Sequence, residues 1–516
     1  MRRIPLADAG FLYLEKRQTP MHVGGLHLFT LPDDVDEAAF LLELAAVLKM
    51  DEAYRRPFGD YVSTGAAGPL GPLYWKADKT FDIDYHVRHS ALPKPGRFRE
   101  LFMLISRLHG TLLDRSRPLW EFHLIEGLQN RQFAMYMKVH HAVTDGVASM
   151  HTVSAMYSTD QNDYCEHSPF SLEAFEAYKT QQRAKHKQQA VIPDSGELRN
   201  VSEALKQQLN VSGNLFGAFK RFGSTFFGGG EGLAVPWHNI PRTSINTDVT
   251  GSRRFVAQSW DFDRINRVAK AMGGTLNDLV LTLCGSALRR YLINQGDLPG
   301  KSLKAMTPIS LRAKDDFDSA NAVSFMIADL ATHLDDPAAR MRCVQASMQA
   351  GKKLMNALTP REAMIFTQVT QIPALFTSVL GLTSKFPAFS TVISNVPGPR
   401  EQLYWNGASL DGMYPVSIVF DGFAMNITLV SYNNKLHFGI IACRRAMPHV
   451  QRLIDYLEDS LQELEEVAGL ITRPGKKAKS RPKRKMAPKK AVTKTAATTT
   501  RTKAKPRPKA KPKSSP

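Results

Sequence analysis

Residues 140–146 of this chain read HHAVTDG, and they stand between a strand-like segment and a helix-like segment. The preceding residues 133–139 alternate with a period of two, and the residues that follow the motif space their apolar side chains as a helix does. The pattern therefore predicts a strand, a turn and a helix. Two adjacent imidazoles followed by a carboxylate also predict a proton acceptor near neutral pH, which could activate an alcohol, thiol or amine for acyl transfer.

The alternation within residues 133–139 distinguishes the two histidines. It places His141 on the apolar face of the strand and His140 on the face of Lys138. Because a buried neutral imidazole is a better base than a solvated, protonated one, we predict that His141 is the base and that His140 positions it. Asp145 orients the site in this interpretation. The alternative is that Asp145 only caps the next helix and that both histidines are satisfied core residues.

The composition is that of a large globular chain. Its 516 residues are enough for two or more domains, and 43% of them are hydrophobic. No apolar run reaches the ~18 residues of a membrane-spanning helix, and acidic residues interrupt the N-terminal segment where a signal peptide would be apolar. The four cysteines lie far apart without a CxxC pair, which predicts neither disulfides nor a zinc site and favours the reducing cytoplasm. We expect no bound metal.

The basic character of the chain is concentrated in its tail. Residues 473–516 carry 18 Lys and Arg and no Asp or Glu, whereas the remaining chain has 49 basic and 48 acidic residues. The tail is rich in Lys, Ala, Pro and Thr without apolar periodicity, which predicts disorder. It either binds anionic lipid or DNA by electrostatic attraction or is a solubilising extension.

The chain divides into four predicted regions: a mixed domain with the HHAVTDG motif (1–180), a connector (181–250), a second mixed domain (251–472) and the tail (473–516). Predicted strands cover 24–29, 81–87, 119–125, 133–139, 255–260, 416–420, 425–432 and 436–442, and a strand with its turn covers 391–399. Predicted helices cover 37–50, 99–113, 265–272, 337–355, 361–380 and 449–467. Thr275 and Asp278 form a capping-box-like pair at the start of a further helix.

The connector contains an unusual aromatic segment. Residues 215–230 combine five phenylalanines, two cations and a glycine run. Such a basic, aromatic stretch is typical of a segment that lies in a membrane or lipid-droplet interface. The alternative is a helix that packs on the body of the protein.

Eight segments, in order, resemble one family. They are PMHVGG (20–25), DYHVRHSALP (84–93), LLDRSRPLWE (112–121), HHAVTDG (140–146), PRTSIN (241–246), LNDLVL (276–281), PISLR (308–312) and SNVPGP (394–399). The chain resembles bacterial wax ester synthase/acyl-CoA:diacylglycerol acyltransferases from about residue 5 to residue 470. The resemblance implies an α/β (α+β) fold of two similar domains like chloramphenicol acetyltransferase, a CoA-dependent acyltransferase, with a central channel between them.

The resemblance also implies the site. It makes His141 the active-site histidine and Asp145 a structural residue paired with an arginine, for which Arg312 is the candidate. Where the family usually has Gly-Asn, this chain has Ala320 and Asn321, so we assign Asn321 no catalytic role. The candidate substrate-site residues are Trp120, Gly146, Asn277, Asp278, Arg312, Ser394 and Asn395. The alternative interpretation of Trp120 is that it is only a core residue. The alternative for Asn277 and Asp278 is that they only form the capping turn.

The resemblance implies an O-acyltransferase that moves a fatty acyl group from acyl-CoA to a long-chain alcohol or diacylglycerol. Acyl-CoA is then a co-substrate and no other cofactor is expected. Such an enzyme would lie in the cytoplasm, peripherally associated with the inner membrane or with lipid droplets. One alternative is an amide-forming condensation on a carrier-bound thioester, which uses the same HHxxxDG motif. The other is a lipid-body coat or tether that holds DNA through the tail.

Overall fold

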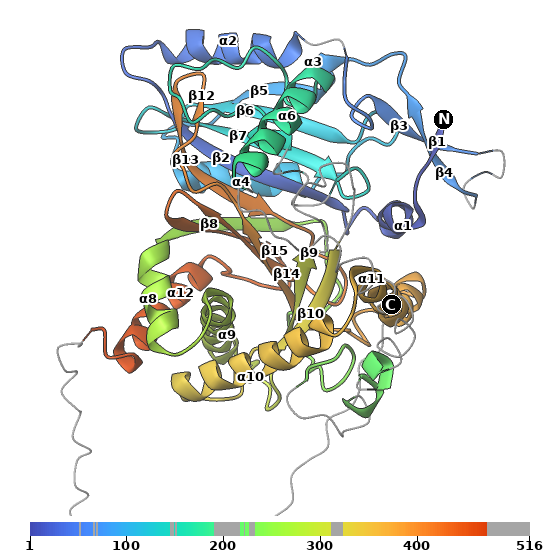
Figure 1. Ribbon diagram of the computed structural model, residues 1–516, viewed down its shortest axis with the longest axis vertical. Helices are drawn as coiled ribbons and strands as arrows, with labels where there is room; N and C mark the ends of the chain where they lie inside the picture. The colour runs from blue at the N-terminus through green and yellow to red at the C-terminus, as the bar shows by residue number, and fades with distance from the viewer. Residues whose placement is uncertain are drawn as a thin grey trace, which may run out of the picture. The chain divides into compact units, whose positions relative to one another are not determined.

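The computed structural model describes residues 1–50, 53–65, 68, 71–144, 149, 152–189, 217–220, 222–225, 233–310 and 323–471. Residues Met1–Thr472 form one compact unit, whose elements are coloured along the chain in Figure 1. The basic tail, Arg473–Pro516, lies outside the described residues, so its disorder stays a prediction.

The helices are α1 (Leu6–Leu14), α2 (Glu37–Lys49), α3 (Ile83–His86), α4 (Phe98–His109), α6 (Leu172–Gln189), α8 (Phe262–Ala271), α9 (Leu276–Gln295), α10 (Pro337–Asn356), α11 (Pro360–Val379) and α12 (Arg452–Val467). The strands are β1 (Arg2–Arg3), β2 (His22–Thr30), β3 (Asp60–Thr64), β4 (Leu73–Ala77), β5 (Val87–Ala91), β6 (Trp120–Glu126), β7 (Gln132–His140), β8 (Arg253–Asp261), β9 (Lys304–Ser310), β10 (Val323–Asp329), β11 (Thr391–Pro397), β12 (Tyr404–Trp405), β13 (Ala408–Val416), β14 (Met425–Tyr432) and β15 (Lys435–Cys443).

Two six-stranded sheets carry the fold. The first has the strand order β12-β13-β2-β7-β6-β5, and the second has the order β10-β9-β11-β14-β15-β8. Strands β1, β4 and β3 form a separate three-stranded sheet. In the first sheet, β7 lies between β2 and β6 and is antiparallel to both. The strand that leads into the HHAVTDG motif is therefore internal, hydrogen-bonded along both edges.

Strands β12 and β13 join the first sheet although they come late in the chain. β13 pairs with β2 of the first sheet, whereas β14 and β15, which follow it directly, belong to the second sheet. The two sheets approach closely here. The backbone of Gly439 in β15 lies so near β13 that a Cβ on Gly439 would overlap the carbonyl oxygen of Pro415. The sequence did not predict this exchange, and the four predicted regions of the chain remain a prediction.

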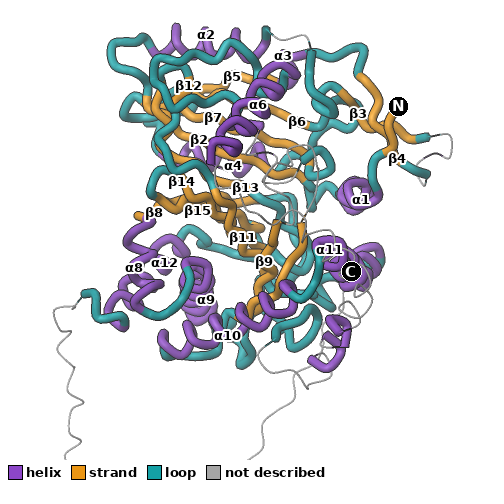
Figure 2. Tube along the Cα trace, viewed as in Figure 1, coloured by secondary structure: helices purple, strands orange, loops and turns teal. Residues whose placement is uncertain are grey.

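Helices α8, α9, α10 and α12 lie against the second sheet (Figure 2), and their buried apolar side chains form one cluster with it. A different cluster joins the two sheets and contains Leu28, Ile105 and Phe255. Polar contacts reinforce that junction: the Phe255 N–H donates to Ser106 Oγ (2.8 Å), and His109 Nε2 lies 2.8 Å from the Ser417 carbonyl oxygen. α4, which carries Ser106 and His109, therefore links the two sheets.

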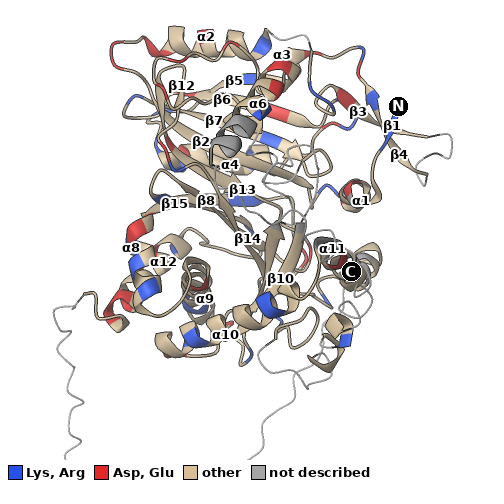
Figure 3. Cartoon of the chain, in the orientation of Figure 1, with Lys and Arg blue, Asp and Glu red and all other residues tan. Residues whose placement is uncertain are grey.

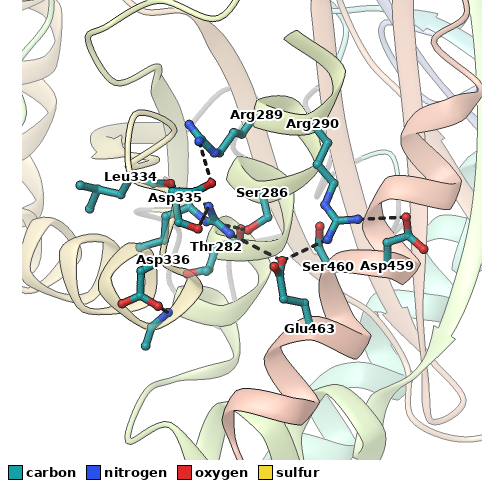
Figure 4. A network of polar contacts seen from close by, with 12 residues as sticks. Thr282, Ser286, Arg289, Arg290, Leu334, Asp335, Asp336, Asp459, Ser460 and Glu463 are labelled. Carbon is teal, nitrogen blue, oxygen red and sulfur yellow. Dashed lines mark hydrogen bonds and ion pairs between the residues drawn. The ribbon is translucent and has the colours of Figure 1, made fainter. Parts of the chain in front are cut away.

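Arginines tie three helices of the second half together (Figure 4). Arg290 of α9 donates to Asp459 and Glu463 of α12 at 3.0 and 3.1 Å. Arg340 of α10 is 3% exposed and donates to Ser286 Oγ of α9 and to the Leu334 carbonyl. Such a buried guanidinium stabilises the fold only while its partners stay in place.

Two predicted strands were wrong. The predicted strand 81–87 contains the short helix α3, because the Asp82 side chain accepts the Asp84 N–H and caps a helical turn before β5 begins. The predicted strand 416–420 is also wrong, since Val416 is the last residue of β13 and pairs with Gly24. Alternation alone could not separate these segments from true strands.

Candidate active site

The two histidines of the motif stand where β7 ends. His140 is the last residue of the strand and pairs in register with His22 of β2, and Val139 pairs with Trp120 of β6. His141 is the first residue of the following turn. Hydrogen bonding on both edges of β7 therefore fixes the point at which the motif leaves the sheet.

The burial of the two histidines is the reverse of the prediction. His140 is 0% exposed, whereas His141 is partly exposed. The cause is that the face of β7 with Lys138 and His140 is covered as well. Lys138 Nζ donates to the carbonyls of Leu108 and Thr111, in α4 and just after it. Alternation indicates a solvated face only where nothing packs on that face.

Both ring nitrogens of His140 face polar partners. The Ala142 N–H donates to Nδ1 at 3.0 Å, and Nε2 lies 3.5 Å from Glu15 Oε1. Because Nδ1 accepts a hydrogen bond, the neutral ring carries its proton on Nε2, toward the carboxylate. The imidazole of His140 is thus held in one orientation inside the protein.

Glu15, the C-cap residue of α1, has a side chain only 3% exposed. Its Oε1 accepts the Met21 N–H (2.9 Å), and its Oε2 accepts from Arg115 Nε (3.2 Å) and Nη2 (3.0 Å). Burial alone would raise the pKa of Glu15, but the contacts with His140, Met21 and Arg115 outweigh it and lower that pKa. The carboxylate is therefore ionised at neutral pH.

His141 is held through its backbone and its ring. Its N–H donates to the Met21 carbonyl oxygen at 2.8 Å. Its imidazole stacks on the ring of Phe11 in α1, with centroids 4.1 Å apart and an angle of 10° between the planes. Because His141 is partly exposed, its imidazole is better placed than that of buried His140 to reach a substrate.

A second buried ionic group lies on the same face of the sheet. Lys138 Nζ is 2.9 Å from Glu121 Oε2, which also lies 3.2 Å from His123 Nε2, and Arg88 approaches the other oxygen at 3.4 Å. Burial opposes ionisation of Glu121, but the hydrogen bond from His123 and the charges of Lys138 and Arg88 lower its pKa to about 2. Burial also lowers the pKa of Lys138, against the attraction of Glu121.

Trp120 lies in the core of the first half. It is 0% exposed, its Nε1 donates to the Phe58 carbonyl at 2.8 Å, and its ring packs against Phe170 and His86 with centroids 4.1 and 4.5 Å away. These contacts favour the core interpretation of this residue. A function of Trp120 in the reaction stays a prediction.

Asn277 and Asp278 start α9, and the predicted capping box is confirmed. Asp278 Oδ2 accepts from the Thr275 N–H (2.9 Å) and from Thr275 Oγ1 (2.7 Å), and the Asp278 N–H donates to Thr275 Oγ1 (3.3 Å). Asp278 is buried, and its Oδ1 has no hydrogen-bond partner within the described part of the chain. Its function in the reaction stays a prediction.

The other predicted site residues are placed in part. Ser394 and Asn395 lie half-buried on β11, which runs parallel to β14. Asp145, Gly146 and Arg312 lie outside the described residues, so the predicted Asp145–Arg312 pair stays a prediction. Among the residues that the structure describes, no hydrogen bond or ring contact joins the two histidines to Asn277, Asp278, Ser394 or Asn395.

Sequence reasoning missed Phe11, Glu15 and Arg115. Arg115 stands inside LLDRSRPLWE, and Glu15 follows directly after the mostly apolar helix α1, so weak signals existed. In the described part of the chain, no group of three or more His, Cys, Asp or Glu residues could hold a metal ion. The helices in those ranges are also too short or too polar to cross a membrane.

Family comparisons cover most of the chain. The model of the wax ester synthase/diacylglycerol acyltransferase catalytic domain matches residues 5–280, which is more than half of the sequence, and the WS/DGAT C-terminal domain matches residues 319–465. The chain belongs to the wax ester synthase/diacylglycerol acyltransferase family. It is therefore an acyltransferase, and the resemblance based on the eight segments is confirmed.

Curated relatives of this acyltransferase match along nearly their whole length. The O-acyltransferase WSD of Acinetobacter baylyi is 41% identical over 470 residues, which cover 90% of this chain and 98% of the relative. A probable diacylglycerol O-acyltransferase of Mycobacterium tuberculosis is 40% identical over 465 residues, with 90% and 98% covered.

Solved structures confirm the predicted fold class. The wax ester synthase/diacylglycerol acyltransferase of Marinobacter aquaeolei has a TM-score of 0.71 at 38% identity and covers 91% of this chain and 100% of its own. The trichothecene 15-O-acetyltransferase TRI3 of Fusarium sporotrichioides (TM-score 0.56, 12% identity, 90% and 94% covered) and the first condensation domain of the CDA synthetase (0.52, 15%, 91% and 96%) share the fold alone.

Proposed function

We propose that this acyltransferase moves a fatty acyl group from acyl-CoA to the hydroxyl of a long-chain alcohol or of diacylglycerol, which yields a wax ester or a triacylglycerol. The observation that carries the proposal is the partly exposed His141 at the end of β7 in a chain of this family. The names of the Mycobacterium relative, a probable diacylglycerol O-acyltransferase, and of the Marinobacter structure, a wax ester synthase/diacylglycerol acyltransferase, support this choice of substrates.

The contacts of the two histidines support His141 as the base. His140 is fully buried, its Nδ1 accepts the Ala142 N–H, and its Nε2 lies 3.5 Å from the Glu15 carboxylate, whereas His141 is partly exposed. In the proposed reaction, neutral His141 takes the hydroxyl proton while the substrate oxygen attacks the thioester carbonyl. The tetrahedral intermediate then collapses, the carbon–sulfur bond breaks, and the CoA thiolate leaves and takes the proton from His141. The two substrates and His141 account for every bond and proton in this reaction, so we propose acyl-CoA as co-substrate and no further cofactor.

The test is CoA release from palmitoyl-CoA by the purified protein, with hexadecanol or dioleoylglycerol as acceptor and chromatography of the ester. Loss of a general base lowers rates by about 10²–10⁴-fold, so His141→Ala should lose turnover to that extent with an unchanged far-UV spectrum. His140→Ala should lose less. Near-wild-type turnover of folded His141→Ala would exclude it as the base, and release only with an amine acceptor would favour the condensation alternative.

We also propose that the enzyme works peripherally on the cytoplasmic face of the inner membrane or on lipid droplets. Exposed apolar side chains gather at the end of α11 and just beyond it, where Phe376, Val379, Leu380 and Phe386 are 64%, 71%, 67% and 57% exposed. No charged residue occurs from 363 to 384, and α11 is tan over most of its length in Figure 3. This surface suits lipid better than water.

Two phenylalanines of the aromatic segment 215–230 pack on the protein itself. Phe219 and Phe222 pack on Phe366 of α11, with ring centroids 5.2 and 5.9 Å apart. For these two residues the packing interpretation is favoured. The remaining phenylalanines of 215–230 lie outside the described residues.

Vesicle flotation tests the proposed surface. Phe376→Ser/Leu380→Ser should reduce binding to phosphatidylcholine vesicles, whereas Leu42→Ser, a 63% exposed leucine of α2, should not. Deletion of 473–516 should remove only the salt-sensitive binding to anionic vesicles. Equal binding by all variants would refute the α11 surface, and tail-dependent, salt-sensitive binding to DNA instead of vesicles would favour the tether alternative.

A further inference from the structure

The end of α1 lies over the two histidines. Phe11 stacks on His141, and Glu15, one helical turn later, reaches His140. Glu15 is 125 positions from His140 in the chain. In Figure 1, α1 lies beside the sheet whose strand β7 leads into the motif. One short helix therefore contacts both imidazoles.

Met21 extends the contact between Glu15 and the motif. Its N–H donates to Glu15 Oε1 at 2.9 Å, and its carbonyl accepts the His141 N–H at 2.8 Å. One peptide segment thus joins the Glu15 carboxylate to the backbone of His141, while the same oxygen lies 3.5 Å from His140 Nε2. A shift of this oxygen would disturb both histidines.

His140 in turn organises the start of the turn. Its N–H donates to the Leu119 carbonyl, its carbonyl accepts the Val143 N–H (2.9 Å), and its Nδ1 accepts the Ala142 N–H (3.0 Å). The Nδ1 contact requires the tautomer with its proton on Nε2, and a carboxylate facing Nε2 stabilises that tautomer. Rotation of this ring would release the Ala142 N–H, which directly follows His141 in the chain.

Arg115 completes the arrangement. It donates to Glu15 Oε2 through Nε and Nη2, and Nη2 also donates to the Leu12 carbonyl of α1. The second oxygen of the carboxylate is therefore anchored, which leaves the first directed at Met21 and His140. Removing either the charge or its anchor would loosen the whole contact.

We propose that Glu15 is a positioning residue of the acyl transfer, which holds the tautomer of His140 and the backbone of His141 through one carboxylate oxygen while Arg115 holds the other. This inference rests on the proposed function of His141 as the base. Misplacement of a catalytic group by about 1 Å lowers rates by up to about 10²-fold, and loss of supporting contacts typically lowers activity by about 10–100-fold.

The experiment measures kcat and KM for palmitoyl-CoA and hexadecanol in full-length Glu15→Ala and Glu15→Gln. Glu15→Ala should lose kcat by about 10–100-fold with each KM within about twofold of wild type. Glu15→Gln keeps an acceptor for Met21 but loses the charge pair with Arg115, so its loss should be about three- to tenfold. Glu100→Gln, at a carboxylate that pairs with Arg97 at 2.9 Å at the start of α4, is the matched control and should leave kcat unchanged.

The His141→Ala background separates positioning from general structure. If Glu15 acts through the histidines, Glu15→Ala should not lower the residual rate of His141→Ala further, whereas damage to the fold would lower both. Three results would each overturn the proposal: wild-type kcat in Glu15→Ala, an increase of both KM values instead of a loss of kcat, and an equal loss in the His141→Ala background. If Glu15→Ala does not fold, wild-type kcat in Glu15→Gln overturns it. Full turnover in His141→Ala alone would instead overturn the proposed base.

Discussion

Lys138→Met removes the ammonium buried behind the HHAVTDG motif and should destabilise the enzyme strongly. Lys138 is fully buried, and its Nζ contacts Glu121 (2.9 Å) and the carbonyls of Leu108 and Thr111 (both 3.2 Å). The variant leaves the Glu121 carboxylate without this partner. Removing one member of a buried ion pair typically destabilises a protein by about 3–5 kcal/mol.

The magnitude also follows from the titration of Glu121. Its pKa is lowered from 4.5 to about 2, and one pKa unit corresponds to about 1.4 kcal/mol, so its ionisation stabilises the fold by about 3 kcal/mol. Because the pKa of Glu121 is lower in the folded protein than in the unfolded chain, this stability is present above pH 4.5 and is lost as the pH falls through about 2. Without Lys138 the pKa of Glu121 rises, but His123 and Arg88 still lower it, so only part of these 3 kcal/mol is lost through Glu121, and the loss should be smaller at pH 3 than at pH 7.

Urea unfolding, followed by tryptophan fluorescence and circular dichroism, measures the loss. Lys49→Met is the matched control, because Lys49 and Asp84 lie 2.6 Å apart but are 36% and 75% exposed, and such surface pairs contribute less than about 1 kcal/mol. In a cycle with Glu121→Gln, the double variant should lose about 2 kcal/mol less than the sum of the single variants. A loss below 1 kcal/mol, the same loss at pH 7 and pH 3, or strict additivity would refute the reasoning.

Three further substitutions test other contacts. Arg340→Met leaves Ser286 Oγ and the Leu334 carbonyl without their donor and should lower the free energy of unfolding by about 2–3 kcal/mol, whereas Arg342→Met, at a 70% exposed side chain, should change it by less than about 0.5 kcal/mol in the same urea titration. Asp278→Ala removes the capping box of α9 and should reduce stability by about 1 kcal/mol with kcat unchanged; a kcat loss above tenfold would instead assign Asp278 to the reaction. Trp120→Phe removes the hydrogen bond to the Phe58 carbonyl and should reduce thermal stability by about 1–3 kcal/mol while the KM values stay the same; a changed KM would contradict the core interpretation.

Local patterns predicted the elements that depend on neighbouring residues. The helix after Thr275 has its predicted capping box, and the paired strands at 119–125 and 133–139 became β6 and β7. A cap joins residues three positions apart, and two strands linked by a short turn are neighbours in the chain, so their energetics are contained in the local sequence. The same locality explains the error at 81–87, since an alternating run there also suits a capped turn.

The eight ordered segments determined the family and the fold class, and they agreed with the strand alternation in the choice of His141 as the predicted base. They did so because the types and spacing of residues in those segments are written in the chain itself. The burial of the two histidines was not contained there, because it depends on α1 and α4, which pack on β7 from distant parts of the sequence.

Only the tertiary structure brought Glu15 and Arg115 to the motif and β13 into the first sheet. These contacts join residues separated by a hundred positions or more, and their stability comes from desolvation and hydrogen bonding that arise when the sheets close on each other. The sequence thus determined which groups are present and in which local elements. Packing decided which nitrogen of His140 faces a carboxylate and which of the two histidines is fully buried.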